Sequence, residues 1–275
     1  MLNSDLEVVN DFGEEWKKFD QSDMTDQELE SIFNEYFSIF PWHTLPNNSQ
    51  GFDLGCGSGR WAKLVTKKCS HLHCIDPSDA IEVAKKNLST YNNCSFYRNG
   101  VDDIPLNDSS MDFGYSLGVL HHIPDTQLGI IECVKKLKPG APFLLYLYYA
   151  FDNQPFWYRI IWKISNVLRI IISKLPFNLK FFFSQIIALI VYLPLARISK
   201  LLEYLKFNVH SFPLSAYRNK SFYTMKTDAL DRFGTKLESR YTKSEINKMM
   251  INAGLEKIIF SDKIPFWVAV GYKSL

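Results

Sequence analysis

The sequence of 275 residues lacks a CxxC pair, a long uncharged run and a large excess of either charge. Its five cysteines are an odd number without metal-ligand spacing, which favours reduced thiols in a cytoplasmic protein and predicts no metal site. The longest uncharged run covers residues 181–196, fewer than the roughly 20 residues that a membrane-spanning helix needs. The acidic N-terminus also lacks the long apolar stretch of a signal peptide.

The formal net charge of +2 conceals two segments of opposite sign. Residues 1–50 contain 11 acidic and 2 basic residues, whereas residues 153–202 contain 7 basic residues and no acidic one. The near-neutral total gives no reason to expect a nucleic-acid partner. The two segments predict two parts of the chain with different roles.

Short apolar runs alternate with helical patterns between residues 45 and 150. The runs that we interpret as strands are residues 51–54, 71–75, 94–98, 111–117 and 141–149. Such alternation is typical of a parallel sheet with helices on both faces. After an interruption, Thr242 and Glu245 form a capping box that starts another helix. Residues 255–260 and 266–272 are then expected to pair as antiparallel strands.

We therefore predict an α/β fold whose seven-stranded mixed sheet is parallel except for its last strand, with a helical insertion after the fifth strand. The predicted parts are an N-terminal helical segment (1–44), a core (45–150), the insertion (151–238) and a return to the core (239–275). A capping box of Thr25 and Glu28 is expected to start a helix over residues 25–40. Three helices are expected in the insertion, over residues 157–175, 181–193 and 195–207.

The sharpest local pattern lies between a strand and a helix and consists of three glycines: Gly55, Gly57 and Gly59. Arg60 stands at the sixth position, so the GxGxxG fingerprint of dinucleotide binding fails. Asp53 precedes the glycines and disfavours a pyrophosphate, but it suits a cationic amine or sulfonium. Asp76 ends the second strand, where an acid can accept hydrogen bonds from ribose hydroxyls. Together these residues favour a positively charged ligand that contains adenosine.

Residues 53–61 resemble motif I of the class I S-adenosylmethionine-dependent methyltransferases, and the order of elements agrees over residues 45–150 and 240–275. The resemblance implies a Rossmann-like domain that binds S-adenosylmethionine and releases S-adenosylhomocysteine. It also implies that the three glycines pass under the methionine part of the cofactor and that Asp76 holds the ribose.

Two further stretches resemble the same family. Residues 101–106 are similar to its adenine-side loop, and the resemblance implies an adenine contact from Asp102 or the backbone of Val101, because Gly100 stands where the family often has an acid. Residues 116–124 resemble the segment after the fourth strand in methyltransferases of the ubiquinone/menaquinone type. This similarity implies that Leu117 borders the methionine moiety and the reacting methyl group.

Several side chains are candidates for chemistry beyond cofactor binding. Methyl transfer needs a nucleophile held about 3 Å from the methyl group, and a base helps if that nucleophile carries a proton. His121 and His122 lie where the resembled family has its transfer pocket, so both are candidate bases, with helix capping or backbone binding as the alternative. His71 and His73 share a strand face but lack a second ligand cluster, so no zinc site is expected. A flap over the cofactor or a helix docked on the sheet is predicted from three aromatic residues at helical spacing: Phe12, Trp16 and Phe19.

The insertion has two interpretations. Its helices have apolar stripes and basic residues, which suit either a lid with its own core (or a dimer interface) or a surface that binds anionic lipid headgroups through residues 153–207. Polar residues at its end are candidates for an acceptor pocket, with ordinary salt bridges as the alternative: Arg218, Tyr223, Asp228, Arg232 and Arg240.

The sequence thus predicts S-adenosylmethionine-dependent methyl transfer to a small or lipid-like acceptor, with oxygen, nitrogen and carbon all open as the methylated atom. The alternatives are a nicotinamide-dependent oxidoreductase, which Asp53 and Arg60 disfavour, and a non-catalytic module that binds the cofactor. We expect a cytoplasmic protein without a nucleic-acid partner. A peripheral position on the inner face of a membrane and a homodimer remain open.

Overall fold

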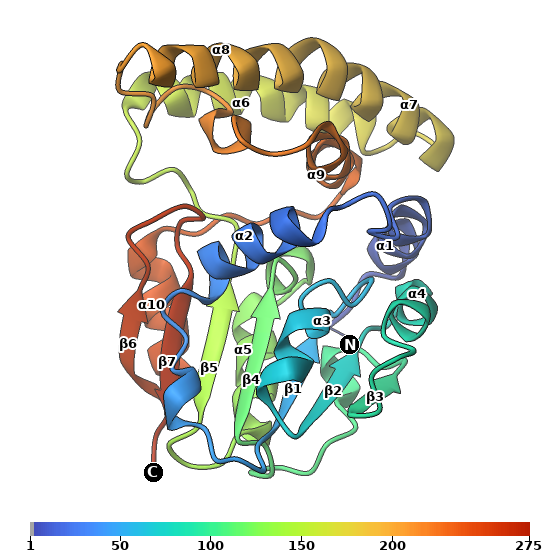
Figure 1. Cartoon of the computed structure of the whole chain (residues 1–275), viewed down its shortest axis with the longest axis vertical. Coiled ribbons are helices and arrows are strands. Elements are labelled where there is room, and N and C mark those ends of the chain that lie inside the picture. Colours follow the sequence, from blue (N-terminus) through green and yellow to red (C-terminus); the bar gives the residue numbers. More distant parts are fainter. Residues whose placement is uncertain (1–2) are drawn as a thin grey trace. The chain divides into compact units, whose positions relative to one another are not determined.

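The computed structural model describes residues 3–275 and divides the chain into two compact units (Figure 1). The first unit comprises the chain up to Gln21, Leu29–Ala150 and Leu237–Leu275, and the second comprises Ser22–Glu28 and Phe151–Lys236. The second unit thus contains Phe151–Lys236 of the predicted insertion 151–238. Most of the predicted N-terminal segment 1–44 lies in the first unit. Its residues 1–2 lie outside the described residues.

The first unit is built on the predicted seven-stranded sheet, whose strands follow the order β3-β2-β1-β4-β5-β7-β6. β7 runs antiparallel to both of its neighbours and the other strand pairs are parallel, which confirms the predicted topology. The strands are β1 (Gln50–Leu54), β2 (His71–Ile75), β3 (Cys94–Tyr97), β4 (Phe113–Leu117), β5 (Pro142–Tyr146), β6 (Leu255–Phe260) and β7 (Ala269–Lys273).

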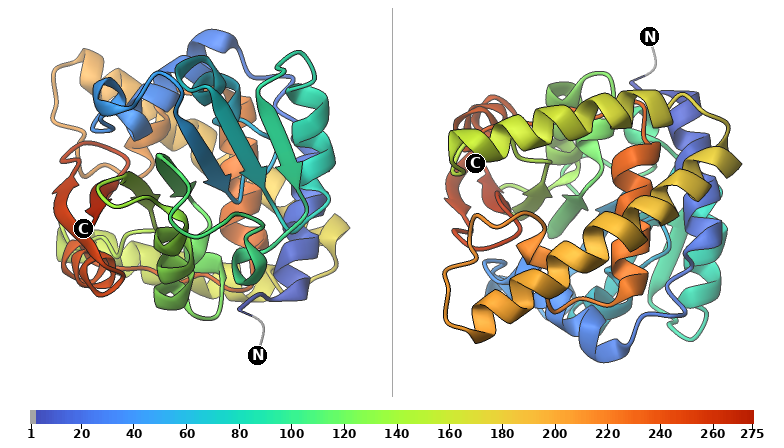
Figure 2. Two further views of the ribbon diagram at one scale, coloured as in Figure 1. Left: turned by 90° about the horizontal axis from the view of Figure 1, so that it is seen from below. Right: turned by 90° about the horizontal axis from the view of Figure 1, so that it is seen from above.

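Helices cover this sheet on both sides, as Figure 2 shows. They are α1 (Leu6–Lys18), α2 (Asp26–Phe37), α3 (Ala62–Val65), α4 (Ala80–Asn87), α5 (Thr126–Lys136) and α10 (Lys243–Asn252), with short 3₁₀ turns that include η1 (Trp42–Thr44), η3 (Val101–Asp103) and η4 (Leu120–His122). Thr242 and Glu245 form the predicted capping box of α10. The box predicted for α2 is only half present: the Thr25 hydroxyl accepts from the backbone N–H of Glu28, but the Glu28 carboxylate binds Ser221 and Thr224 instead.

Two glycines allow β1 and β4 to pack closely at the centre of the sheet. Gly51 stands beside Phe113 in the register, and Phe52 stands beside Gly114. A Cβ atom on Gly51 would lie 2.2 Å from the Phe113 ring, and one on Gly114 would lie 2.3 Å from the Phe52 ring. Each glycine therefore makes room for a fully buried aromatic ring of the neighbouring strand.

Gly114→Ala is expected to destabilise the fold, because the added methyl group must displace the buried Phe52 ring. Overpacking of this kind typically lowers the free energy of unfolding by about 1–3 kcal/mol, which urea unfolding would measure. Gly100→Ala is the matched control, since its added Cβ would lie 3.9 Å from Pro77 and meets ordinary packing. Equal stability of the two variants would contradict the proposed fit of Phe52 against Gly114.

The second unit is helical. Its elements are α6 (Phe156–Ile172), α7 (Phe177–Ile187), a π-helical turn η5 (Ala188–Tyr192), α8 (Leu193–Tyr204), a 3₁₀ turn η6 (Ser215–Tyr217) and α9 (Phe222–Gly234). Met225, Ala229 and Phe233 of α9 form its small core with side chains of α6 and η5. α6 and the α7–α8 helix both lie over α9 (Figure 2, right).

The prediction of separate helices over residues 181–193 and 195–207 is wrong, because Phe177–Tyr204 is one continuous helix of 28 residues. Pro194 does not end it, since Pro194 stands in the first turn of α8 directly after the π-helical turn, where the hydrogen-bond pattern changes. By length and composition this helix would suffice to cross a membrane, with a mean hydropathy of 1.9 and 22% of its most apolar window buried. Lys180 and Arg197, which bound the uncharged run in the sequence, lie within the helix.

The apolar stripe at helical spacing over residues 157–175 lies largely outside the core of the second unit. Of its eight residues, only Ile172 is buried, and Leu175 is half-buried. Six are exposed to solvent: Trp157, Ile160, Ile161, Ile164, Leu168 and Ile171. The face of α6 that is buried instead carries Arg169, whose guanidinium donates to the backbone oxygens of Thr235 and Lys236.

Candidate functional site

The glycine loop follows β1 at the carboxyl edge of the parallel strands. Gly55, Gly57 and Gly59 have φ angles of +76°, +53° and +78°, a region that favours glycine. The backbone N–H groups of Gly55 and Cys56 both donate to the oxygen of Ile75, at 2.8 and 3.1 Å. These two hydrogen bonds hold the loop against the end of β2. The result is a compact backbone turn that a ligand can approach closely.

Asp76 fastens the same loop through its side chain. One carboxylate oxygen accepts from the backbone N–H of Gly57 at 2.9 Å, and the other accepts from the backbone N–H and the hydroxyl of Ser78, at 2.9 and 2.6 Å. Burial raises the pKa of Asp76, while the bonds from Ser78 and Gly57 act in the opposite direction. Asp76 thus holds the backbone around the place where the resemblance puts the ribose; the ribose contact itself remains a prediction.

Asp53 is buried in β1 beside Tyr115 of β4. The Tyr115 hydroxyl donates to the Asp53 carboxylate at 2.9 Å. Burial raises the pKa of Asp53 to about 8, although the hydrogen bond from Tyr115 lowers it. Two buried carboxyl groups, Asp53 and Asp76, therefore flank the glycine loop. Burial favours the protonated form of Asp53 at neutral pH, and a nearby positive charge would favour its ionised form.

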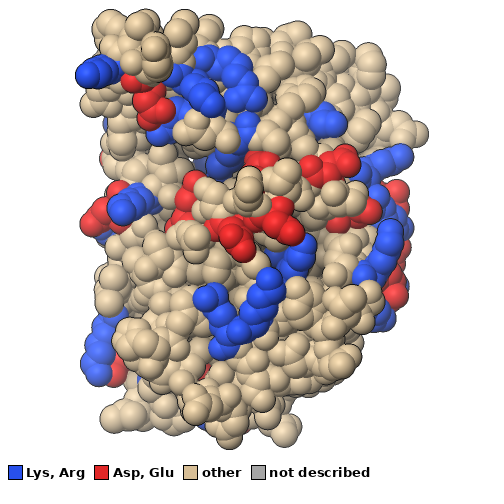
Figure 3. Space-filling view, viewed as in Figure 1, with Lys and Arg blue, Asp and Glu red and all other residues tan. Residues whose placement is uncertain are grey.

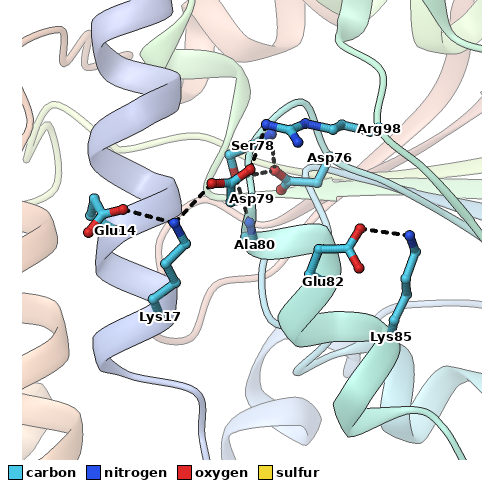
Figure 4. Close-up of polar contacts among 9 residues, drawn as sticks. All are labelled: Glu14, Lys17, Asp76, Ser78, Asp79, Ala80, Glu82, Lys85 and Arg98. Atoms are coloured by element: carbon cyan, nitrogen blue, oxygen red, sulfur yellow. Dashed lines mark hydrogen bonds and ion pairs between the residues drawn. The ribbon is translucent and has the colours of Figure 1, made fainter.

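Helix α1 docks on this loop through Trp16. A Cβ atom on Gly57 would lie 3.1 Å from the Trp16 indole, and the Arg60 guanidinium lies 5.8 Å from the same ring and 4.2 Å from that of Trp61. Figure 4 shows Lys17 of α1 reaching Asp79 at the start of α4, beside Ser78 and Asp76. α1 is thus docked against the glycine loop and the start of α4, in line with a docked helix; a flap over the cofactor remains a prediction.

The residues expected on the adenine side lie on η3. Val101 is buried, whereas Asp102 is exposed and accepts from the backbone N–H of Asn3 at 2.6 Å. Asn3 also exchanges two hydrogen bonds with the backbone of Asp125. Leu117 is buried at the end of β4. Their contacts with a cofactor remain predictions.

His121 and His122 are both buried in η4, with ring centres 4.0 Å apart. Nδ1 of His122 lies 2.7 Å from the backbone oxygen of Leu237, so Nδ1 carries the proton and Nε2 carries the lone pair. Nδ1 of His121 lies 3.4 Å from the backbone N–H of Tyr148 and accepts from it. Burial lowers the pKa of His121 well below its usual value, so this ring stays neutral.

Aromatic rings and one arginine surround this histidine pair. The Tyr148 ring lies 3.9 Å from that of His121, and Phe12 of α1 lies 5.0 Å from His122. Arg240 lies 5.0 Å above the Tyr148 ring and pairs with Glu238 at 2.8 Å. Of the predicted acceptor residues, Arg240 therefore belongs to the first unit beside the histidines.

The other four predicted acceptor residues belong to the second unit. Arg218 pairs with Glu203 at 2.8 Å and also binds the Ser215 oxygen, so it makes the ordinary salt bridge that was the alternative. The Arg232 guanidinium lies 5.4 Å from the centre of the Trp162 ring. In α9, Tyr223 is buried and Asp228 is half-buried. An acceptor pocket made of all five residues remains a prediction.

The structure also shows what surrounds His71 and His73. Their rings bind Ser95 and Tyr97 of the neighbouring strand β3, at 2.9 and 3.3 Å. Within residues 3–275 no group of three or more His, Cys, Asp or Glu side chains is arranged to hold a metal ion.

Three site residues escaped the sequence reasoning. Tyr115 was treated as part of an apolar strand, although its place beside Asp53 follows once β1 is paired with β4. Val119 covers Gly55, where an added Cβ would lie 2.4 Å from it. Tyr148 lies just past β5 in the run 141–149 that was interpreted as a strand. The available signal was the cluster of tyrosines at the end of this run, since tyrosine combines an apolar ring with a polar group.

Comparison with known proteins agrees with this geometry. Residues 52–145 match a family model described as a methyltransferase domain. A Methanococcus vannielii protein named "Probable cobalt-precorrin-6B C(15)-methyltransferase (decarboxylating)" is 30% identical over 96 residues, which are 34% of this chain and 50% of that protein. A tRNA U34 carboxymethyltransferase from Nautilia profundicola is 25% identical over 122 residues, which are 42% of this chain and 41% of that protein. The chain thus spans half or less of the length of these relatives.

Among solved structures, an Aquifex aeolicus S-adenosylmethionine-dependent methyltransferase has the same fold, with a TM-score of 0.51 at 14% identity over 94% of this chain and 96% of that one. The matched residues 52–145, the sheet order and the glycine loop agree with a methyltransferase domain of class I. The cofactor that such a domain implies is S-adenosylmethionine.

Asp76→Ala is expected to weaken the binding of S-adenosylhomocysteine roughly 100-fold. It removes the three hydrogen bonds that shape the glycine loop, and a 100-fold loss corresponds to about 2.7 kcal/mol, the worth of about one hydrogen bond to a charged group. Isothermal titration calorimetry would measure the affinity. Asp108→Ala, which removes only an exposed pair with Lys136, is the control. Unchanged affinity in Asp76→Ala, with unfolding as in the control, would refute the assignment.

The buried Asp53 predicts a pH dependence of stability. With a pKa near 8, the folded chain keeps a proton that the unfolded chain loses at about pH 4, so this group lowers the free energy of unfolding as the pH rises between these values. Asp53→Asn can still accept from Tyr115 but does not ionise. Between pH 5 and 8 we expect the unfolding free energy of Asp53→Asn to fall less than that of the wild type. The difference should be a few kcal/mol, since one pKa unit corresponds to about 1.4 kcal/mol. Parallel pH profiles of both proteins would contradict the raised pKa.

Proposed function

We propose that this chain is an S-adenosylmethionine-dependent methyltransferase that acts on a small or lipid-like acceptor. The observation that supports it most is the glycine loop held by Asp76 beside the buried Asp53, within a matched methyltransferase domain. When bound, S-adenosylmethionine supplies a methyl group activated by the sulfonium charge. The three glycines, Asp53 and Asp76 would hold its methionine and ribose parts, and η3 its adenine.

His122 is the proposed general base. The hydrogen bond to Leu237 fixes the ring in the tautomer whose Nε2 can accept a proton from an oxygen or nitrogen acceptor. In the same way, a carbonyl or carboxylate orients the histidine of many hydrolases. Its ring packs against a tilted Phe12 ring and edge-on to the Tyr148 ring, which keep bulk water away from the proton transfer.

His121 has a different role in this proposal. Because Nδ1 accepts from Tyr148, the proton of the neutral ring lies on Nε2, which is buried and has no hydrogen-bond partner among residues 3–275. A buried donor of this kind orients an acceptor oxygen rather than removing its proton. His121 is thus a positioning group in this proposal. Of the two predicted candidate bases, only His122 keeps that role.

The charge pattern supports a small or lipid-like acceptor over a nucleic acid, because the total is near neutral and the loop is flanked by buried carboxyl groups. The same carboxyl groups disfavour a nicotinamide dinucleotide, whose pyrophosphate is negative. A cytoplasmic location belongs to this proposal, with the insertion able to bring the chain to the inner face of a membrane.

His122→Ala is expected to lower methyl transfer by about 100-fold or more while S-adenosylhomocysteine binding stays unchanged, because only the proton transfer is lost. The acceptor is first found by incubating the protein with labelled S-adenosylmethionine and acceptors pooled as sugars, amino acids, quinones or lipids. The pH profile of the transfer rate then separates a base from a structural residue, since only loss of the base removes the acid limb.

His43→Ala, which changes an exposed histidine of η1, is the matched control. A wild-type rate of methyl transfer in His122→Ala would overturn the assignment of His122 as the base, but not the proposed methyltransferase activity. Binding of S-adenosylhomocysteine with no label in any pool would favour the non-catalytic module, and binding of NADH in place of S-adenosylhomocysteine would favour the oxidoreductase.

A further inference from the structure

The second unit exposes large apolar side chains on both of its long helices. On α6, Ile160, Ile164, Val167 and Ile171 follow one another along the exposed face. On the helix Phe177–Tyr204, Leu179, Phe183, Ile190 and Leu201 do the same. Isolated exposed apolar residues are normal in soluble proteins, but rows of them along two long helices of one unit mark an interaction surface. We call this surface, made of the exposed faces of α6 and α7–α8, the apolar face.

The side chains that these helices bury are unusually small or polar. Along the helix Phe177–Tyr204 the buried positions are Lys180, Ser184, Ala188, Tyr192, Ala196 and Ser199, which recur every three or four residues. Helices of soluble proteins normally bury their large apolar residues and expose the polar ones. Small residues between helices and large apolar ones outside are the arrangement found where the surroundings are lipid.

Basic residues border the apolar face. Arg159 and Lys163 lie along one edge of the α6 stripe, and Arg197 and Lys200 belong to α8; all four are exposed. Arg169 and Lys180 are buried, so they do not contribute to this border. Residues 153–202 contain no acid. In Figure 3, uncharged surface extends over α7, and Lys and Arg gather toward α8.

We propose that the apolar face binds the surface of a membrane that contains anionic lipids. The large apolar side chains enter the boundary between headgroups and acyl chains, and the bordering bases pair with lipid phosphates. The exposed Trp157 lies in the first turn of α6 and the exposed Tyr204 ends α8, positions suited to aromatic side chains at the headgroup level. Where it concerns substrate, this inference rests on the proposed function, since it brings the methyltransferase domain to lipid-like acceptors.

A second copy of the chain fits this face less well. The commonest homodimers are two-fold symmetric, so the same surface would meet itself. The bases that border the apolar face would then approach bases of the other copy, without acids from residues 153–202 to pair with them. Anionic headgroups provide the opposite charge that the face itself lacks.

A position along the membrane surface also fits better than a span. One side of the helix Phe177–Tyr204 packs on α9, where Met225, Ala229 and Phe233 contact Ala188, Tyr192 and Ala196. The buried Lys180 and Ser184 lie on this side as well. A spanning helix would have to leave α9 and bring Lys180 into hydrocarbon, whereas a helix lying on the surface keeps both contacts.

Co-sedimentation of the full chain with vesicles tests the proposal. The chain should sediment with phosphatidylcholine vesicles that contain phosphatidylglycerol, and high salt should weaken this binding. Ile164→Asp, at a position 65% exposed, should weaken it about tenfold or more, because it places a charge in the apolar contact. Arg159→Glu with Lys163→Glu should weaken it about fivefold for each base removed.

Ile251→Asp is the matched control, since Ile251 is 55% exposed on α10 of the first unit and should leave vesicle binding unchanged. S-adenosylhomocysteine binding, measured in every variant, should stay at the wild-type value, so failure of the membrane proposal is distinguishable from failure of the proposed function. Absence of vesicle binding at low salt would overturn the proposal. So would a dimer in analytical ultracentrifugation that Ile164→Asp converts to monomer, or equal binding to vesicles with and without phosphatidylglycerol.

Discussion

The hydrogen bond between the Gly57 backbone and the Asp76 carboxylate joins the two halves of the cofactor site. It connects the loop after β1 to the end of β2, and Ser78 holds the other carboxylate oxygen. Because Asp76 is buried, the charge that accepts these bonds is weakly solvated and depends on them. The loop can therefore keep its three left-handed glycines in place, and other elements pack on a fixed backbone: Trp16 on Gly57 and Val119 on Gly55.

The parts of the fold that the sequence predicted depend on local patterns. Apolar runs ended by Asp76 or by the glycines indicate strand ends, and the order of elements then fixes a parallel sheet with one antiparallel strand. The pairing of Asp53 with Tyr115 was out of reach without the strand order, because 62 residues separate them in the chain. The tautomers of His121 and His122 depend likewise on backbone groups of Tyr148 and Leu237 that only the fold brings near.

The insertion was predicted as helical, but the sequence left open whether its apolar stripes face a core or lie outside it. Periodicity shows that a helix has an apolar stripe, and it does not show whether that stripe meets a core, a partner or lipid. On α6 the polar Arg169 finds backbone oxygens inside the unit, which allows the apolar stripe to remain outside. The continuity of α7 and α8 was missed because a proline normally ends a helix, and the π-helical turn that precedes Pro194 leaves no clear trace in the sequence.

The two chain connections of the insertion link the membrane proposal to the chemistry. The chain leaves the first unit at Ala150, just after Tyr148, and returns at Leu237. The two connections pair with each other, since the backbone N–H of Tyr241 donates to Tyr148 and that of Ala150 donates to Tyr241. Tyr148 binds His121, and Leu237 orients His122. The residues at the two connections of the insertion are therefore the same ones whose backbone groups set both histidine tautomers.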